Sequence, residues 1–262
     1  MTLPKINWSP LDTELANWRD EGRRIPIWWR DDDAIAATTP LDRLIGLSES
    51  YGLPLHLAVI PATAQPELAH RLSAASSVVP VVHGWAHRAH TPSTEKRAEF
   101  AASRPLPDRL MDAREGLTRL RQLLGGEEAV APMFVPPWNR IGPDLAPGLA
   151  DMGYRFLSTY GPRATESAAP GLITVNTHLD VIDWRGTRSL VPPEQLIAGL
   201  VAALKSRREG QTDTAEPLGL LTHHLVHDTP IWEFTERLID RLMQGPVQSW
   251  RADAPQIKGN SA

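Results

Sequence analysis

The chain of 262 residues is 42% hydrophobic and carries 27 Lys and Arg against 31 Asp and Glu, which gives a net charge of -4. A chain of this length can bury a large core, and it fits one barrel-sized α/β domain. Because no basic block stands out, a nucleic-acid surface is not expected. The sequence contains no Cys, which excludes disulfides and thiolate metal sites.

The first ten residues, MTLPKINWSP, have neither the basic region nor the apolar region of a secretion signal. No apolar run approaches the roughly 18 residues that a membrane span requires. We therefore predict a cytoplasmic protein that binds neither nucleic acid nor a membrane, with its oligomeric state left open. We expect a single domain over residues 1–250 and a disordered tail over residues 251–262.

Helical and strand-like patterns alternate along the chain, as judged from hydrophobic periodicity and from Pro and Gly at the boundaries. The predicted helices cover residues 9–22, 39–52, 66–75, 105–124, 143–152, 193–208 and 231–243. The predicted strands cover residues 25–33, 53–60, 77–82, 132–136, 154–159, 172–178 and 217–222, and a loop is expected over 161–170. This alternation predicts an α/β fold with a mostly parallel sheet, closed as an irregular (β/α)7 barrel.

Three adjacent acids, Asp31, Asp32 and Asp33, end the first predicted strand. They repel one another, and burying them without a cation or strong hydrogen-bond donors would be costly. A solvated turn explains them equally well when they are taken alone. The segment His83-Gly-Trp-Ala-His87 follows the third predicted strand, and two His with one carboxylate make a plausible three-ligand metal site.

Polar side chains follow five predicted strands. Because parallel strands of a barrel end on one face, these residues are expected to meet at one mouth, where barrel enzymes hold their sites. The five segments are Asp31 to Asp33, His83, Pro137 to Asn139, Asp180 to Trp184, and His223 with His224.

In residues 25–240 these motifs resemble, in order, those of the polysaccharide deacetylases with the NodB homology domain, carbohydrate esterase family 4. The first family motif is an Asp pair, a general base followed by a metal ligand. We place the base at Asp32 and the ligand at Asp33, with Asp31 and Asp32 as the alternative pair. The second motif, His-x-x-x-His, is matched by His83 and His87, which the resemblance makes the other two metal ligands.

The third motif resembles the segment from Phe134 to Asn139, which includes Pro137 and Trp138, although Val135 stands where the family has an Arg. Because that Arg holds the catalytic Asp in the family, either Arg30 or Arg140 replaces it here or the base is oriented differently.

The fourth motif contributes an Asp and a Trp to the pocket and resembles Asp180 to Trp184. The fifth places a catalytic His at the end of the last strand. We prefer His223, with His224 and His227 as the other candidates, and we assign His224 to the pocket.

The resemblance implies a metal-dependent hydrolase that removes an acyl group, in the first instance N-acetyl, from a small carbohydrate or related amide. Asp32 would take a proton from the attacking water, and His223 would protonate the leaving amine. Zinc is the expected ion, with cobalt, nickel and manganese as alternatives. The competing hypothesis is a non-catalytic carbohydrate-binding barrel descended from a deacetylase, which the missing Arg favours and which metal content would distinguish.

Overall fold

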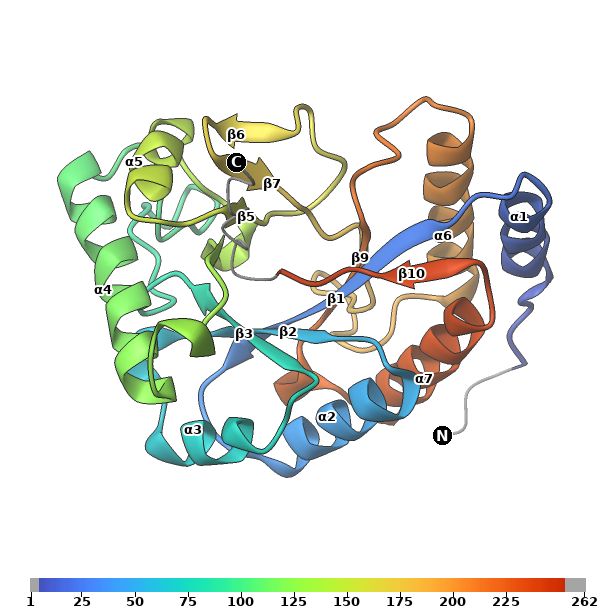
Figure 1. The fold of residues 1–262 in the computed structure, drawn as a ribbon, viewed down its shortest axis with the longest axis horizontal. Coiled ribbons are helices and arrows are strands. Elements are labelled where there is room, and N and C mark those ends of the chain that lie inside the picture. The colour runs from blue at the N-terminus through green and yellow to red at the C-terminus, as the bar shows by residue number, and fades with distance from the viewer. Residues whose placement is uncertain (1–4, 253–262) are drawn as a thin grey trace, which may run out of the picture.

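The apolar runs of the sequence form a curled ten-stranded sheet in the computed structural model, which describes residues 5–252 (Figure 1). The strands pair in the order β6-β7-β5-β4-β3-β2-β1-β9-β8, and β10 pairs with the first residues of β1. All pairs are parallel except that of β6 with β7. The strands are β1 Ile25–Ala34, β2 Leu55–Val59, β3 Val78–His83, β4 Met133–Val135, β5 Phe156–Leu157, β6 Ser167–Ala169, β7 Leu172–Thr174, β8 Leu179–Asp180, β9 Leu218–Thr222 and β10 Val247–Ser249.

Helices surround this sheet (Figure 1). They are α1 Ser9–Asp20, α2 Thr39–Tyr51, α3 Pro66–Ser73, α4 Leu106–Leu124, α5 Ala146–Asp151, α6 Pro193–Arg208 and α7 Thr229–Met243, with short 3-10 turns η1 Pro61–Thr63, η2 Glu127–Ala129, η3 Pro137–Asn139, η4 Pro143–Leu145 and η5 His224–Val226. Gly52 and Gly125 end α2 and α4 in the left-handed region, with φ of 63° and 98°. Glycine adopts that conformation without the steric penalty that a side chain would add.

One extended segment connects the two sides of the sheet. Of the predicted strand over 172–178, only Leu172–Thr174 is observed as a strand, β7, which pairs with β5. β8 begins one residue after the predicted end and pairs with β9. Between them, Asn176 Oδ1 accepts a hydrogen bond from the Thr159 amide at 2.8 Å, and the Thr177 amide donates to the Thr159 carbonyl at 3.1 Å. The predicted α/β fold, with its sheet curled into an irregular barrel, is confirmed.

Besides β8, two further observed strands lie outside the predicted ones. β6 falls within the predicted loop 161–170 and pairs antiparallel with β7. β10 pairs Val247 with Ile25 at the start of β1. Both are three residues long and are defined by the strand beside them, so neither carries a hydrophobic period long enough to be recognised in the sequence.

The alternation of side chains along β1 separates two apolar layers. Trp28 packs with residues of the inner face, among them Ala58 and Val81, whereas Trp29 belongs to the layer beneath the helices. Because side chains alternate between the faces of a strand, Arg30 and Asp32 share the inner face with Trp28. The pleat of β1 therefore directs one acid of the Asp triplet inward.

The segment after β10 packs against the inner layer. The Trp250 ring stacks on His56 with 5.4 Å between centroids and meets Trp28 edge-on at 5.5 Å. The His56 Nδ1–H donates to the Trp29 carbonyl at 3.0 Å, and Nε2 accepts from the Ala252 amide at 3.0 Å. His56 is thus a satisfied neutral core residue. Of the predicted tail, Arg251 and Ala252 have defined positions, and residues 253–262 lie outside the described residues.

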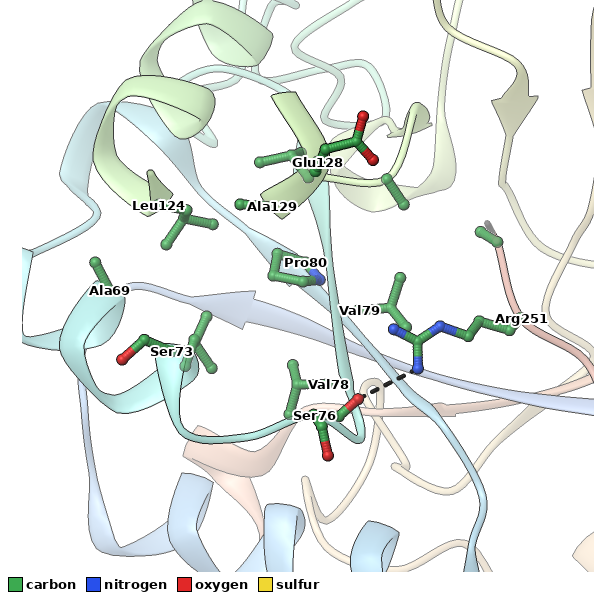
Figure 2. Close-up of a pocket in the computed structure, with 14 residues that line it drawn as sticks. Ala69, Ser73, Ser76, Val78, Val79, Pro80, Leu124, Glu128, Ala129 and Arg251 are labelled. Atoms are coloured by element: carbon green, nitrogen blue, oxygen red, sulfur yellow. Dashed lines mark hydrogen bonds between the residues drawn. The ribbon is translucent and has the colours of Figure 1, made fainter. Parts of the chain in front are cut away.

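A cavity of about 450 Å³ lies where β3 begins, at the end of the sheet opposite the predicted site (Figure 2). Its lining includes Val78, Pro80 and Leu124, with Arg251 donating to the Ser76 carbonyl at its edge. None of the predicted site residues lines it. Within residues 5–252, moreover, none of the helices has the length and apolar character that crossing a bilayer requires.

Replacing His56 with Gln is expected to make the free energy of unfolding less sensitive to acid. Burial lowers the pKa of His56 from 6.5 to about 3, so just below pH 6.5 the unfolded chain takes up a proton that the folded chain does not. The contribution of the neutral ring is complete above pH 6.5 and declines as the pH falls toward 3, by about 1.4 kcal/mol per pH unit.

Urea denaturation at pH 7.5 and pH 5.5 measures this difference. The wild type should lose about 1.4 kcal/mol more than His56→Gln between the two conditions. The exposed His70 supplies the control, since His70→Gln should behave as the wild type. Equal losses in the wild type and in His56→Gln would contradict the assignment of His56 as a neutral core residue.

Candidate active site

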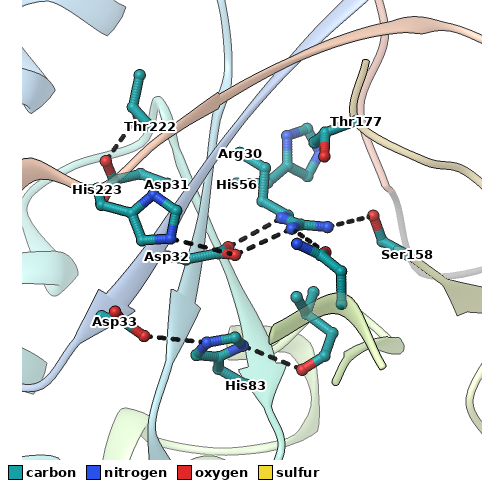
Figure 3. Close-up of polar contacts among 12 residues, drawn as sticks. Arg30, Asp31, Asp32, Asp33, His56, His83, Ser158, Thr177, Thr222 and His223 are labelled. Atoms are coloured by element: carbon teal, nitrogen blue, oxygen red, sulfur yellow. Dashed lines mark hydrogen bonds and ion pairs between the residues drawn. The ribbon is translucent and has the colours of Figure 1, made fainter. Parts of the chain in front are cut away.

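The end of β1 departs from regular strand geometry at the Asp triplet. The register against β2 shifts between Asp31 and Ala34, and Asp33 has a φ of 74°. Without this irregularity Asp33 would follow Asp31 to the outer layer. Instead, Asp33 Oδ1 lies 3.1 Å from His83 Nε2 (Figure 3). It also lies 3.2 Å from His87 Nε2, so the predicted ligands meet at one point.

The two His rings are oriented by different parts of the chain. His83 ends β3 on the inner face, and its Nδ1–H donates to the Val135 carbonyl at 3.0 Å. That bond fixes the orientation of the ring and leaves Nε2 facing Asp33. His87 follows a turn, has a φ of 52°, and lies with its ring centroid 4.3 Å from that of Trp138.

The pKa values in this cluster reflect competition between burial and charge. Burial acts to raise the pKa of Asp33, but the hydrogen bond and the charge of His83 outweigh it and hold the pKa well below the ordinary value. Burial acts to lower the pKa of His83, and the charges of Asp32 and Asp33 raise it overall. For His87, burial and the neighbouring His83 lower the pKa. Asp33 is therefore ionised, and His87 tends toward the neutral form that binds metals.

The donor set suits a divalent ion. The ligand atoms of Asp33, His83 and His87 all lie within 4.8 Å of one another, and one carboxylate with two imidazoles is a set that zinc and its first-row neighbours accept. A second group, formed by His90, Glu99 and Asp112, satisfies the same distance criterion.

The acids of this second group have other partners. The Glu99 carboxylate accepts backbone hydrogen bonds from Trp85 and Ala86 at 3.1 and 2.8 Å. Asp112 pairs with Arg104 at 2.6 Å. Asp33, His83 and His87 are thus the better candidate for a metal centre.

Asp32 is held by a buried guanidinium. Arg30 Nε lies 2.8 Å from Asp32 Oδ1, and Nη2 donates to Oδ2 at 2.9 Å (Figure 3). Arg30 donates in addition to Ser158 Oγ and to Asn139 Oδ1, both at 2.7 Å. The side chain of Arg30 is fully buried, so these bonds are made away from water, where they are strong and directional.

Of the two candidates for the missing third-motif Arg, Arg30 is the one that contacts Asp32. Arg140, the other candidate, donates instead to the carbonyl of Arg97 at 2.8 Å.

His223 lies across from Asp32, with its Nε2 4.0 Å from Asp32 Oδ2. The Trp184 ring packs edge-on against it at 4.7 Å, and Trp184 Nε1–H donates to Asp180 Oδ2 at 2.8 Å. Burial is the largest influence on Asp180 and raises its pKa, although the charge of His223 opposes this. The fourth and fifth predicted motifs are thus brought together beside Asp32.

Asp31 and His224 form a separate buried pair. Asp31 Oδ1 lies 2.5 Å from His224 Nδ1, while Oδ2 accepts from Thr222 Oγ1 at 2.7 Å and from the His224 amide at 2.9 Å. Burial acts to raise the pKa of Asp31, and the charge and hydrogen bond of His224 lower it overall. The sequence placed His224 on the wall of the pocket. It is only 1% exposed, however, so it lies in the layer behind the site.

The remaining predicted residues are less uniform in exposure, since Pro137 is buried and Trp138 and Asn139 are half-buried. Pro137, Trp138 and Asn139 form η3, in which Trp138 and Asn139 take left-handed φ angles of 57° and 56°. The third candidate acid, His227, faces Trp232 with 4.5 Å between ring centroids, and its Nε2 accepts from the His223 amide at 3.4 Å. His223 is the candidate that lies within 4.0 Å of Asp32.

Sequence reasoning missed several supporting residues. Ser158 accepts a hydrogen bond from Arg30, and Thr222 donates one to Asp31. Glu99 binds the turn between the paired His residues. Ser158 and Thr222 stand at strand ends, which is a weak signal shared by many residues. Glu99 lies in the polar, irregular stretch before α4, where nothing in the sequence distinguishes it from its charged neighbours.

The sequence matches no protein-family model and no curated protein. In structure, a Mycobacterium smegmatis protein assigned as a polysaccharide deacetylase is similar, with a TM-score of 0.58 and 18% identity over 79% of this chain and 72% of that one. The peptidoglycan deacetylase PdaC from Bacillus subtilis is similar with a TM-score of 0.53 and 15% identity, over 86% of this chain and 87% of that one. At these identities the likeness concerns the fold, and the chain has the fold of the polysaccharide deacetylases that its five motifs resemble.

Proposed function

We propose that this chain is a metal-dependent hydrolase that removes an acyl group, in the first instance N-acetyl, from a carbohydrate or related amide. The observation that carries the proposal is the convergence of Asp33, His83 and His87 beside an Asp32 held by Arg30. The solved structures with a similar fold include deacetylases of polysaccharide and of peptidoglycan, which supports the same reaction class.

Asp33, His83 and His87 would hold one divalent ion, with zinc expected and cobalt, nickel or manganese as alternatives. When bound, such an ion polarises an acyl carbonyl and lowers the pKa of water. The hydrogen bond from His83 to Val135 supports this assignment, because metal-binding His residues are usually oriented by a bond at the other ring nitrogen.

In the proposed reaction, Asp32 accepts a proton from water as the water oxygen attacks the acyl carbon. The C–N bond then breaks, and His223 supplies the proton that the leaving nitrogen needs. Arg30 keeps the Asp32 carboxylate in one orientation through its paired contacts. The separation of 4.0 Å between Asp32 and His223 supports a base and an acid acting on one substrate. The products are a free acid and an amine.

The mouth offers room for the rest of a substrate. We place the acyl group between Trp138 and Trp184, with the Trp138 amide as the candidate donor to the developing oxyanion. An open groove of about 710 Å³ begins at Asn139 and is lined by Arg140, Thr159 and the segment from Thr91 to Ala102. A sugar chain longer than one residue would extend into it.

The competing hypothesis, a non-catalytic sugar-binding barrel, was favoured by Val135 at the third-motif Arg position. Arg30 weakens that argument, because it contacts Asp32 from a position two residues earlier on the same strand. Compartment bears on the substrate: a cytoplasmic chain, as predicted, would meet glycan precursors or amide metabolites before finished polymers.

Purified wild-type protein is expected to bind one equivalent of divalent metal, and His83→Ala to lose it at micromolar concentration, because one imidazole ligand is removed. His90→Ala is the matched control, since His90 belongs to the second acidic group and should leave the metal content unchanged. Elemental analysis after dialysis against zinc measures both. Equal metal content in wild type and His83→Ala would refute the ligand assignment.

Asp32→Asn is expected to retain the metal and to lose turnover by about 10²–10⁴-fold, the usual contribution of a general base. Acetate release from N-acetylated glucosamine oligomers and from peptidoglycan fragments provides the assay, with Glu67→Gln on the exposed surface of α3 as the control. A metal-loaded wild type that binds these sugars and releases no acetate would favour the sugar-binding alternative.

Arg30→Lys is expected to keep the metal and to lower kcat by about 10²-fold, because a Lys lacks the planar fork that orients Asp32. Steady-state kinetics should show the change mainly in kcat. Arg43→Lys serves as the comparison, since Arg43 forms an exposed ion pair with Glu236 away from Asp32. Unchanged kcat in Arg30→Lys would show that Asp32 does not depend on this guanidinium.

A further inference from the structure

The turn between the paired His residues has a strained backbone path. Gly84 and His87 both take positive φ angles, 58° and 52°, in the left-handed region. This path brings His87 back toward Asp33 after His83 has ended β3. It also directs several backbone N–H groups of the turn to one side, which is the arrangement of an anion-binding nest.

A buried carboxylate fills that nest. Glu99 Oε2 accepts from the Trp85 amide at 3.1 Å, and Oε1 accepts from the amides of Ala86 and Arg88 at 2.8 and 3.4 Å. Glu99 is fully buried. Hydrogen bonds from backbone donors to an ionised carboxylate are stronger than those to a neutral acceptor, so the three bonds tie the turn to a single group.

The surroundings leave this carboxylate little freedom. A Cβ at Gly84 would lie 2.4 Å from Glu99 Oε2 and 2.5 Å from Pro137 Cδ, so the turn, the acid and η3 are in close contact. A Cβ at Gly116 of α4 would lie 2.7 Å from the Gly84 carbonyl oxygen. Phe100, beside Glu99 in the chain, is fully buried and packs edge-on against Phe134.

The two His ligands depend on this arrangement unequally. His83 belongs to β3 and is fixed by the strand and by the Val135 carbonyl. His87 lies inside the span that Glu99 holds, between the amides of Ala86 and Arg88. Any relaxation of the turn would therefore displace His87 and leave His83 in place.

We propose that Glu99 is a positioning residue for the metal centre, whose carboxylate pre-forms the turn that presents His87 to the ion. The proposal rests on the proposed function, since it requires Asp33, His83 and His87 to bind a metal. Glu99 acts through the backbone and is not itself a ligand, although it lies near His90 and Asp112.

The test measures Co²⁺ binding by the full chain, from visible absorption and chelator competition. Glu99→Gln replaces one acceptor oxygen with an NH₂ group that faces backbone donors, and it should weaken Co²⁺ binding by about 10–100-fold, the usual effect of residues that orient metal ligands. The absorption spectrum should change as well, because the His87 ring is released. Glu95→Gln, on the exposed part of the same segment, should bind Co²⁺ as the wild type does.

A double-mutant cycle distinguishes positioning from a general loss of stability. If Glu99 acts through His87, then Glu99→Gln should change the Co²⁺ dissociation constant less than about twofold when His87 is already Ala. Equal effects in the two backgrounds would overturn the proposal. Should Glu99→Gln fail to fold, Glu99→Asp replaces it in the same cycle, since it keeps the charge but is one methylene too short to reach all three amides.

The outcomes separate the two proposals. Wild type that binds Co²⁺ together with Glu99 variants of unchanged affinity and spectrum overturns the positioning role alone. Wild type that binds no Co²⁺ overturns the metal-dependent function and this inference with it.

Discussion

The burial of Asp31 and Asp32 at the end of β1, with Asp33 half-buried beside them, is the constraint on which the site depends. An ionised carboxylate loses its hydration in such a place and requires a cation or several donors in exchange. The chain meets this requirement with separate partners: His224 and Thr222 for Asp31, Arg30 for Asp32, and the His83 and His87 pair for Asp33. The repulsion within the triplet is thereby divided among three directions.

This division arises from backbone geometry. The pleat of β1 sends Asp31 to the helical layer and Asp32 to the inner face, and the irregularity at Asp33 turns the third acid toward β3. Because β9 and β3 lie on the two sides of the β1–β2 pair, the partners come from strand ends that the parallel order brings to one mouth. In a different strand order, these side chains would lie too far apart to contact one another.

The arginine that holds the candidate base illustrates how a site can keep its geometry while its sequence pattern changes. Val135 stands where the resembling family has an Arg, yet Arg30 reaches Asp32 from two residues earlier on the same strand. The contacts of Arg30 with Ser158 and Asn139 join β1 to the segments after β5 and β4.

The sequence by itself determined the alternation of strands and helices, the α/β class and the clustering of polar residues at strand ends, because hydrophobic period and Gly or Pro punctuation are local properties. It also singled out Asp33, His83 and His87. Only the tertiary structure decided which acid of the triplet faces which partner, that Arg30 and not Arg140 contacts Asp32, that His224 lies behind the site, and that Glu99 holds the turn. Those outcomes depend on a one-residue irregularity in β1 and on contacts between segments distant in the chain, and neither leaves a periodic trace in the order of the residues.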